Sequence, residues 1–370
     1  MDRSTAKIVI LGGYGTTGQM VAELLLRHTS VQLVLAGRNR QKADAAAAEL
    51  NLRFGGTRVT GRFADAADSD SLKLLFDDAN LAVVASSSSQ HAREVAISAM
   101  ETETDVLDIQ YSAHKMQVLR SLEPQIKDAG RCFITDGGFH PGLAAVLVHA
   151  AAAQFDALET ANVGSVIKID WPRLQLGEAT VQELAAELKD FDTTYFTQGQ
   201  WKKGGLRRFD FGPPFGKSFC SAMMLEEMRL LPDRYPGLKD TGFFVGGFNP
   251  FVDWVVMPLG MVAFKLFPNR SLRSVSRLMG WGLVKFSKPP YGTILKVEAS
   301  GTKNGHVQTL EMTVYHEDGY WLTAIPVVAC LLQYLDGSIR RSGLWTQANL
   351  VQPDRLLKDM QKMGVVLHPR

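Results

Sequence analysis

Residues 7–28, KIVILGGYGTTGQMVAELLLRH, join a short apolar run to a glycine- and threonine-rich turn and then to a helical pattern. Gly12, Gly15 and Gly18 stand three residues apart, a GxxGxxG variant of the commoner GxGxxG pattern. Between a strand and a helix, such glycines allow a sharp turn, a close approach of the backbone to a pyrophosphate, and tight packing of helix on sheet. A simple strand-to-helix turn is the alternative. The context favours a dinucleotide cradle.

The surrounding 140 residues alternate extended apolar runs with helical patterns. Strands are expected at 7–11, 31–36, 57–63, 81–86, 105–109 and 131–135. Helices are expected at 17–28, 40–51, 68–78, 90–100 and 113–129, the last interrupted by Pro124. This alternation predicts parallel strands joined by right-handed crossovers, the α/β class with a doubly wound Rossmann sheet. Such sheets bind ligands outside the carboxyl ends of their strands.

The loop after the second expected strand indicates which dinucleotide would bind. An NAD site usually has an acidic residue there, whereas this chain has Arg38, Asn39 and Arg40. A guanidinium matches the 2′-phosphate of NADP in charge and in donor geometry. The arginines are alternatively solvated loop charges. We expect NADP rather than NAD.

Two later loops complete the expected cofactor site. Asp65, after the third strand, would reach the adenine amino group or else serve as a helix N-terminal residue, and the sequence does not decide between them. Ser86 and Ser87, after the fourth strand, would lie near the ribose and nicotinamide, or belong to a helix-capping loop. The predicted cofactor-binding residues are Gly12, Tyr14, Gly15, Thr16, Thr17, Gly18, Arg38, Asn39, Arg40, Asp65, Ser86 and Ser87.

The bulk properties of the chain narrow its class. Its 370 residues are 46% hydrophobic with a formal net charge of +2, which allows a large core and gives no global attraction to nucleic acid. Cys132, Cys220 and Cys330 are far apart and lack metal-ligand spacing, which predicts reduced thiols. The N-terminus has no signal-peptide pattern. We expect a cytoplasmic protein without a bound metal.

With these motifs in place, the chain resembles the saccharopine dehydrogenase-like oxidoreductases. The resemblance is carried by GGYGTTG, AGRNRQKA, LDIQYSAHK and TDGGFHPGLAAVL over residues 6–150, and more weakly by SGLWTQANLVQPDRLLKDMQKMGV near the C-terminus. It implies an NADP-binding Rossmann domain, a second domain on an antiparallel sheet, and reduction of an imine, carbonyl or activated double bond. His140-Pro141-Gly142 replaces the acidic residue usual before Pro-Gly. Saccharopine is therefore not the expected substrate.

From residue 159 onward the pattern becomes mixed. Strands are expected at 160–170, at 206–212 and in a hairpin over 292–317 around Asn304-Gly305, and helices at 178–191 and 325–335. We expect a Rossmann domain over 1–140 and a second α/β domain, with a mainly antiparallel sheet, over 141–345. Within 346–370, a C-terminal helix would return to the first domain. A homodimer is one option that the sequence leaves open.

Residues 243–288 form the most apolar stretch of the second half. Phe243–Phe267 is long enough to cross a bilayer, but Asp253, Lys265 and two prolines oppose a membrane-spanning helix. Two interpretations remain, an interfacial helix on an anionic membrane and a buried helical pair with a solvated basic face. Either one allows the segment to line a wide apolar pocket. The basic residues that follow the apolar run are Arg270, Arg273, Arg277, Lys285 and Lys288.

Hydride transfer to a polar double bond needs a proton donor near the nicotinamide. His140 and Tyr111 are the predicted catalytic residues, because they lie in loops after the fifth and sixth strands. His140 alternatively hydrogen-bonds the backbone of its turn, and Tyr111 alternatively packs on the nicotinamide. The other polar residues at this edge, which would orient these groups or cap strand ends, are Asp108, His114, Lys115 and Asp136.

Three functions are consistent with these features. The first is an NADPH-dependent oxidoreductase that acts on C=N, C=O or activated C=C bonds of a bulky hydrophobic substrate, in peripheral contact with a membrane through residues 243–288. The second is a soluble reductase of an amino-acid-derived imine. The third is a non-catalytic NADP-binding regulator. The apolar segment favours the first.

Overall fold

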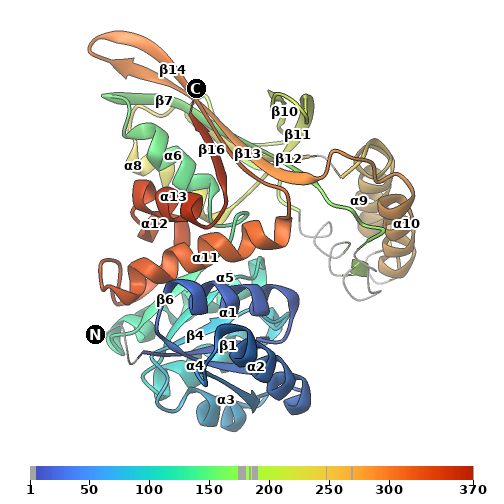
Figure 1. Ribbon diagram of the computed structural model, residues 1–370. Helices are drawn as coiled ribbons and strands as arrows, with labels where there is room; N and C mark the ends of the chain where they lie inside the picture. The colour runs from blue at the N-terminus through green and yellow to red at the C-terminus, as the bar shows by residue number, and fades with distance from the viewer. Residues whose placement is uncertain are drawn as a thin grey trace. The chain divides into compact units, whose positions relative to one another are not determined.

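The computed structural model describes residues 6–173, 181, 182, 185, 191–246, 248–267 and 270–369 (Figure 1). The chain divides into two compact units. The first comprises residues 1–146 and 320–363, and the second comprises 147–319 and 364–370. Compactness alone does not define a domain that folds independently, so the boundaries expected at residues 140 and 345 stay predictions.

A parallel sheet forms the centre of the first unit. Within the described residues its strand order is β3-β2-β1-β4-β5-β6-β15, and every pairing is parallel. Its strands are β1 (Lys7–Leu11), β2 (Gln32–Gly37), β3 (Val59–Phe63), β4 (Leu81–Val84), β5 (Asp105–Asp108), β6 (Cys132–Thr135) and β15 (Gly343–Thr346). The first six coincide with the expected strands. The order of β1 to β6 is that of a Rossmann fold and places the topological switch point between β1 and β4.

Helices cover this sheet. The side chains of α3, α4 and α5 share one core with Val9, Val34 and Phe133 of the strands, and the alternate residues Ile8 and Ile10 are equally buried. Strands buried on both faces explain the continuous apolar runs in the sequence. The helices of the unit are α1 (Thr16–His28), α2 (Arg40–Phe54), α3 (Ser69–Phe76), α4 (Ala92–Glu101), α5 (Ala113–Asp128), α11 (Gly319–Leu335), α12 (Gln347–Leu350) and α13 (Pro353–Lys362).

The seventh strand comes from the far end of the chain. Gly343 of β15 pairs with Cys132 of β6, which extends the sheet beyond the six expected strands. Two residues of the same late segment, one in α11 and one just after it, hydrogen-bond to β5. The Tyr334 hydroxyl donates to Oδ2 of buried Asp105 at 2.6 Å, and Nε of Arg340 donates to the same oxygen at 2.8 Å. The Rossmann sheet is thus completed by residues that follow the main part of the second unit, residues 147–319, in sequence.

The second unit contains a mixed, mainly antiparallel sheet. Its main path is β10-β11-β12-β7-β13-β14-β16, β8 pairs with β12 and β9, and only β7 with β12 is parallel among the described pairings. The strands are β7 (Ala157–Lys168), β8 (Thr194–Thr197), β9 (Gln200–Lys203), β10 (Leu206–Asp210), β11 (Lys217–Met223), β12 (Asp240–Gly246), β13 (Gly292–Lys303), β14 (His306–His316) and β16 (Val366–Pro369). Asn304 and Gly305, with φ of +52° and +77°, form the expected turn of the β13–β14 hairpin. The expected fold class is confirmed.

A helix pair occupies the apolar segment of this unit. A π-helical turn at Val252–Val256 leads into α9 (Met257–Leu266), and α10 (Leu272–Lys285) packs beside it (Figure 1). In the described residues no helix has the length and apolarity needed to span a membrane. Two further helices are α6 (Ala144–Ala152), which begins in the first unit, and the short α8 (Leu231–Arg234). The helix expected at 178–191 falls largely outside the described residues.

Candidate cofactor and active site

The glycine loop lies at the switch point of the parallel sheet. Gly12 has φ of +87°, and a Cβ there would lie 2.8 Å from the Ala85 and Ser86 backbone after β4. A Cβ on Gly18 would lie 2.3 Å from the Gly12 carbonyl oxygen, so α1 can pack this close only with glycine. Gly15 is exposed at the N-cap of α1, beside exposed Thr16 and half-buried Thr17. The free N–H groups of α1 therefore face solvent, as an anion site requires.

Tyr14 connects this loop to the end of β2. Its ring occupies the space beside Gly37, where a Cβ would lie 2.6 Å from the ring, and its hydroxyl accepts from the Asn39 N–H at 3.1 Å. The Asn39 side chain caps α2 by accepting from the Lys42 N–H at 2.9 Å. Tyr14 and Asn39 thus have structural contacts that position the loop after β2.

The two arginines of this loop differ. Arg40 Nε donates to both carboxylate oxygens of Asp44, at 3.0 and 2.8 Å. Arg38 is exposed and has no hydrogen bond or ion pair within the part of the chain that the structure describes. Its guanidinium is therefore the available one for a 2′-phosphate beyond the end of β2.

Asp65, Ser86 and Ser87 follow β3 and β4. Oδ1 of Asp65 accepts from the Ala67 N–H at 3.0 Å, whereas Asp68, three residues later, is the residue that caps α3. The Ser86 hydroxyl lies 2.9 Å from that of buried Ser88, and Ser87 is exposed. The structure therefore brings Ser86 beside the glycine loop, whereas the hydrogen bonds that the structure describes for Asp65 are local to the loop after β3 and the start of α3.

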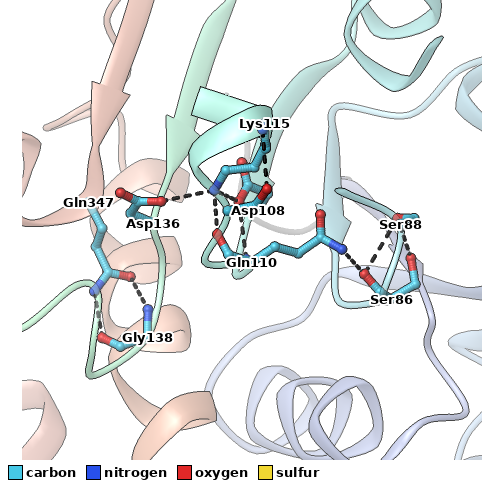
Figure 2. Close-up of polar contacts among 9 residues, drawn as sticks. Ser86, Ser88, Asp108, Gln110, Lys115, Asp136, Gly138 and Gln347 are labelled. Atoms are coloured by element: carbon cyan, nitrogen blue, oxygen red, sulfur yellow. Dashed lines mark hydrogen bonds and ion pairs between the residues drawn. The ribbon is translucent and has the colours of Figure 1, made fainter. Parts of the chain in front are cut away.

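A buried ion cluster occupies the carboxyl ends of β5 and β6 (Figure 2). Nζ of Lys115, from the first turn of α5, lies 2.6 Å from Oδ1 of Asp108 and 2.9 Å from Oδ1 of Asp136. It also donates to the Gln110 carbonyl oxygen. All three charged residues are at most 5% exposed. Asp136 has φ of +56°, a conformation unusual for a residue with a side chain, so this geometry is constrained by its surroundings.

The charges in this cluster do not balance. Burial disfavours the ammonium form of Lys115, but Asp108 and Asp136 outweigh it and raise the Lys115 pKa. Burial also raises the pKa of Asp136, although Lys115 opposes the shift. One ammonium between two carboxylates leaves one excess negative charge in the cluster. Lys115 is therefore held in its ammonium form, and the pKa of Asp136 lies above its ordinary value.

The turn that contains His140 lies next along this edge. Gly138 and Gly142 have φ of +129° and +125°, and a Cβ on Gly142 would lie 2.3 Å from the Gly138 carbonyl oxygen. Gln347 holds the turn through bonds with the Gly138 N–H at 3.3 Å, its carbonyl at 3.1 Å and the Gly142 carbonyl at 3.1 Å (Figure 2). Burial of the imidazole lowers the pKa of His140 to about 4, so the ring is neutral near pH 7.

The two other residues expected at this edge, Tyr111 and His114, are not part of the ion cluster. Tyr111 is half-buried between β5 and α5, and His114 is exposed on α5. Within the described residues no group of three or more histidine, cysteine or acidic side chains could hold a metal ion. Sequence reasoning considered Lys115, Asp108 and Asp136 without placing them in one cluster, and it missed Gln110 and Gln347. The available signal was two aspartates at the ends of adjacent parallel strands and a lysine at the start of the helix that follows the first of these strands.

Comparisons with known proteins agree with this geometry. Residues 8–134 match the family described as saccharopine dehydrogenase NADP binding domain. The fold is similar to that of apo saccharopine dehydrogenase (L-Glu forming) from Saccharomyces cerevisiae, at 15% identity and a TM-score of 0.68, with 99% of this chain and 100% of that chain covered.

Weaker similarity is found to a meso-DAP dehydrogenase mutant from Clostridium tetani, at 13% identity, a TM-score of 0.48 and coverage of 97% and 99%. A comparison with curated protein sequences gives no match. Residues 8–134 therefore form an NADP-binding domain of the saccharopine dehydrogenase type, and the protein is an NADP-dependent oxidoreductase. The expected cofactor is confirmed.

Proposed function

We propose that the protein is an NADPH-dependent reductase of a C=N, C=O or activated C=C bond in a bulky hydrophobic substrate. The observation that carries the NADPH part is the pairing of an open glycine cradle with an unpaired, exposed Arg38 at the neighbouring strand end. Gly12, Gly15, Thr16 and the α1 N-terminus would bind the pyrophosphate. Arg38 would bind the 2′-phosphate. The bound cofactor supplies a hydride to the electrophilic carbon of the substrate.

We assign the polar roles to His140 and Tyr111. A neutral imidazole at pH 7 is a hydrogen-bond donor through its N–H group, so His140 would polarise the substrate carbonyl or imine without giving up a full proton. The Tyr111 phenol would donate the proton that the heteroatom or the neighbouring carbon acquires after the hydride is received. Each role requires only that the group lies at the carboxyl edge of the parallel sheet.

The apolar character of the substrate is supported by the α9–α10 pair. Large apolar side chains are unusually exposed there, which favours contact with an apolar ligand or surface over packing alone. These exposed residues include Trp254, Leu259, Val262, Leu266, Phe267 and Trp281, each between 53% and 64% exposed. The buried face consists of other residues, among them Val252, Phe264, Met279 and Leu283. The pair is thus amphipathic, with an outer face that is itself largely apolar.

We also propose that this outer face contacts an anionic membrane surface. Basic side chains lie among the exposed aromatics, and Asp253 is the only acidic residue between 243 and 288. The rings of Phe251, Trp281 and Phe286 form a surface cluster with centroids 4.8–5.4 Å apart. Aromatic and basic residues together suit the lipid headgroup region. The exposed basic residues are Lys265, Arg270, Arg273, Arg277, Lys285 and Lys288.

A substrate screen tests the reductase proposal. Apolar enones, ketones and imines are compared with amino-acid-derived imines, and deuterium transfer from 4-deuterated NADPH to the product is measured by mass spectrometry. Turnover of apolar substrates is expected. Turnover of amino-acid-derived imines alone would assign the protein to the soluble amino-acid reductases instead.

Vesicle co-sedimentation tests the membrane proposal. Binding to vesicles with phosphatidylserine, and not to phosphatidylcholine alone, is expected, with weakening by salt and by Arg273→Glu with Arg277→Glu. Lys202→Glu with Lys203→Glu, on the exposed strand β9 of the same unit, is the matched control and should bind normally. A wild-type protein that binds no vesicle but dimerises through this face would contradict the proposal and support a homodimer.

A further inference from the structure

A continuous chain of hydrogen bonds joins three adjacent strand ends of the parallel sheet (Figure 2). After β4, the Ser86 carbonyl oxygen accepts from Nε2 of Gln110. After β5, the Gln110 carbonyl oxygen accepts from Lys115, and its N–H donates to Oδ1 of Asp108 at 3.2 Å. After β6, Asp136 accepts from the same lysine at 2.9 Å. The loops after β4, β5 and β6 are therefore tied to one ammonium group.

The coordination of Lys115 is complete. An ammonium has three N–H donors, and here they go to Asp108, Asp136 and the Gln110 carbonyl. A backbone bond from the Gly137 N–H to the Asp108 carbonyl, at 2.9 Å, adds a second connection between the loops after β5 and β6. With every donor used and both carboxylates buried, these three loops have one low-energy arrangement.

Stability alone does not account for this cluster. A buried ion pair gains little over well-packed apolar side chains, because desolvation of the charges offsets their attraction. The cluster lies instead at the carboxyl edge, where a Rossmann sheet binds its ligand, and it reaches Ser86, whose backbone adjoins Gly12. Arg38 lies at the end of β2, on the other side of the switch point. The cluster thus lies on the side of the switch point opposite to Arg38.

We propose that Lys115 is a positioning residue for the nicotinamide half of the NADP site, acting through Gln110 on the loop after β4 and through Asp136 on the loop after β6. This inference rests on the NADPH-binding function proposed above. The lysine touches neither cofactor nor substrate. It fixes the loops that do, so its loss affects the nicotinamide end of the cofactor and leaves the adenosine end unchanged.

The test compares the binding of NADPH with the binding of adenosine 2′,5′-bisphosphate, which lacks the nicotinamide half. NADPH spans both sides of the switch point, whereas adenosine 2′,5′-bisphosphate occupies only the Arg38 side. For Lys115→Met we expect NADPH binding to weaken about tenfold, the factor that one net hydrogen bond contributes, with bisphosphate affinity unchanged. The fluorescence enhancement of bound NADPH, which reports immobilisation of the nicotinamide, should also fall. Lys115→Arg, which keeps the positive charge between the two carboxylates, should restore part of both.

A second variant decides the result if Lys115→Met does not fold. Gln110→Leu leaves the ion cluster intact and removes only the connection to Ser86, so it should lower NADPH affinity and fluorescence in the same direction. Gln125→Leu, the same change on the exposed face of α5, is the matched control. Equal loss of both ligands in the folded variants, or no loss of either, would overturn the inference. A wild-type protein that binds no NADPH would instead overturn the proposed function.

Discussion

Lys115 in the first unit and Trp281 in the second lie in environments opposite to those that their side chains prefer. Lys115 is 1% exposed between two carboxylates, whereas Trp281 on α10 is 53% exposed. The carboxyl edge of the parallel sheet buries charge, and the α9–α10 pair exposes apolar surface. Neither arrangement by itself stabilises the folded state. We interpret the two regions by the ligands proposed for them above, a polar cofactor for the first and an apolar surface for the second.

The largest effect expected at the polar edge comes from Gly15→Val. Gly15 is exposed, and a Cβ there would approach only the Gly12 carbonyl oxygen, at 3.2 Å, so the fold should persist. The valine would occupy the pyrophosphate position. Loss of two backbone bonds to phosphate, about 1.5–3 kcal/mol each, corresponds to at least a hundredfold loss of NADPH affinity. Calorimetric titration measures it.

Gly56→Val provides the control for that measurement, because Gly56 is also exposed and nothing lies within 4 Å of its added Cβ. It should bind NADPH normally. Normal NADPH affinity in Gly15→Val as well would mean that the loop is only a turn. The interpretation of the polar edge as a cofactor site would then be wrong.

Two adjacent residues of α10, one on its buried face and one on its exposed face, test the difference between the two faces. Leu283 is fully buried, and Leu283→Ala should lower the free energy of unfolding by about 2–5 kcal/mol. Val284 is 44% exposed, and Val284→Ala should change it by at most about 0.5 kcal/mol. Urea denaturation measures both values. Similar losses for the two variants would show that the outer face is buried in solution, by another copy or another part of the chain.

Acid should reveal the burial of His140. Its pKa is about 4 in the folded protein and 6.5 ordinarily, so the unfolded chain takes up the proton first as the pH falls. Stability is therefore lost from about pH 6.5 down to pH 4, by about 3 kcal/mol at about 1.4 kcal/mol per pH unit. His140→Asn should lose correspondingly less between pH 7 and pH 4 in denaturation experiments. An identical acid dependence in both proteins would place the imidazole in solvent.

The smallest of these effects concerns the choice of cofactor. Arg38→Ala should weaken NADPH by about 1–3 kcal/mol, the contribution of a charge-assisted hydrogen bond, and leave NADH unchanged. Arg40→Ala is the matched control, since Arg40 is already paired with Asp44. Binding of both dinucleotides is measured by fluorescence. Equal affinities for NADPH and NADH in the wild type would exclude the assignment of Arg38.

The sequence predicted the strands of the first unit closely, because residues such as Ile8, Ile10, Leu33 and Leu35 are apolar without interruption between turn signals. It could not predict burial of Lys115, since a lysine in the first turn of a helix is usually solvated. Nor could it predict which apolar residues of α10 face the core. Periodicity finds one apolar face, and here both faces are apolar in part.

The late strand β15 has a consequence for synthesis of the protein. While residues 343–346 remain untranslated, β6 is an open sheet edge, and open edges invite pairing with other chains. Asp105 meanwhile lacks both Tyr334 and Arg340, the partners of its buried carboxylate. The nascent Rossmann unit therefore stays incomplete on the ribosome until residues 147–319 of the second unit, and β15 after them, have emerged. We therefore expect fragments that end near residue 146 to aggregate more readily than the full chain.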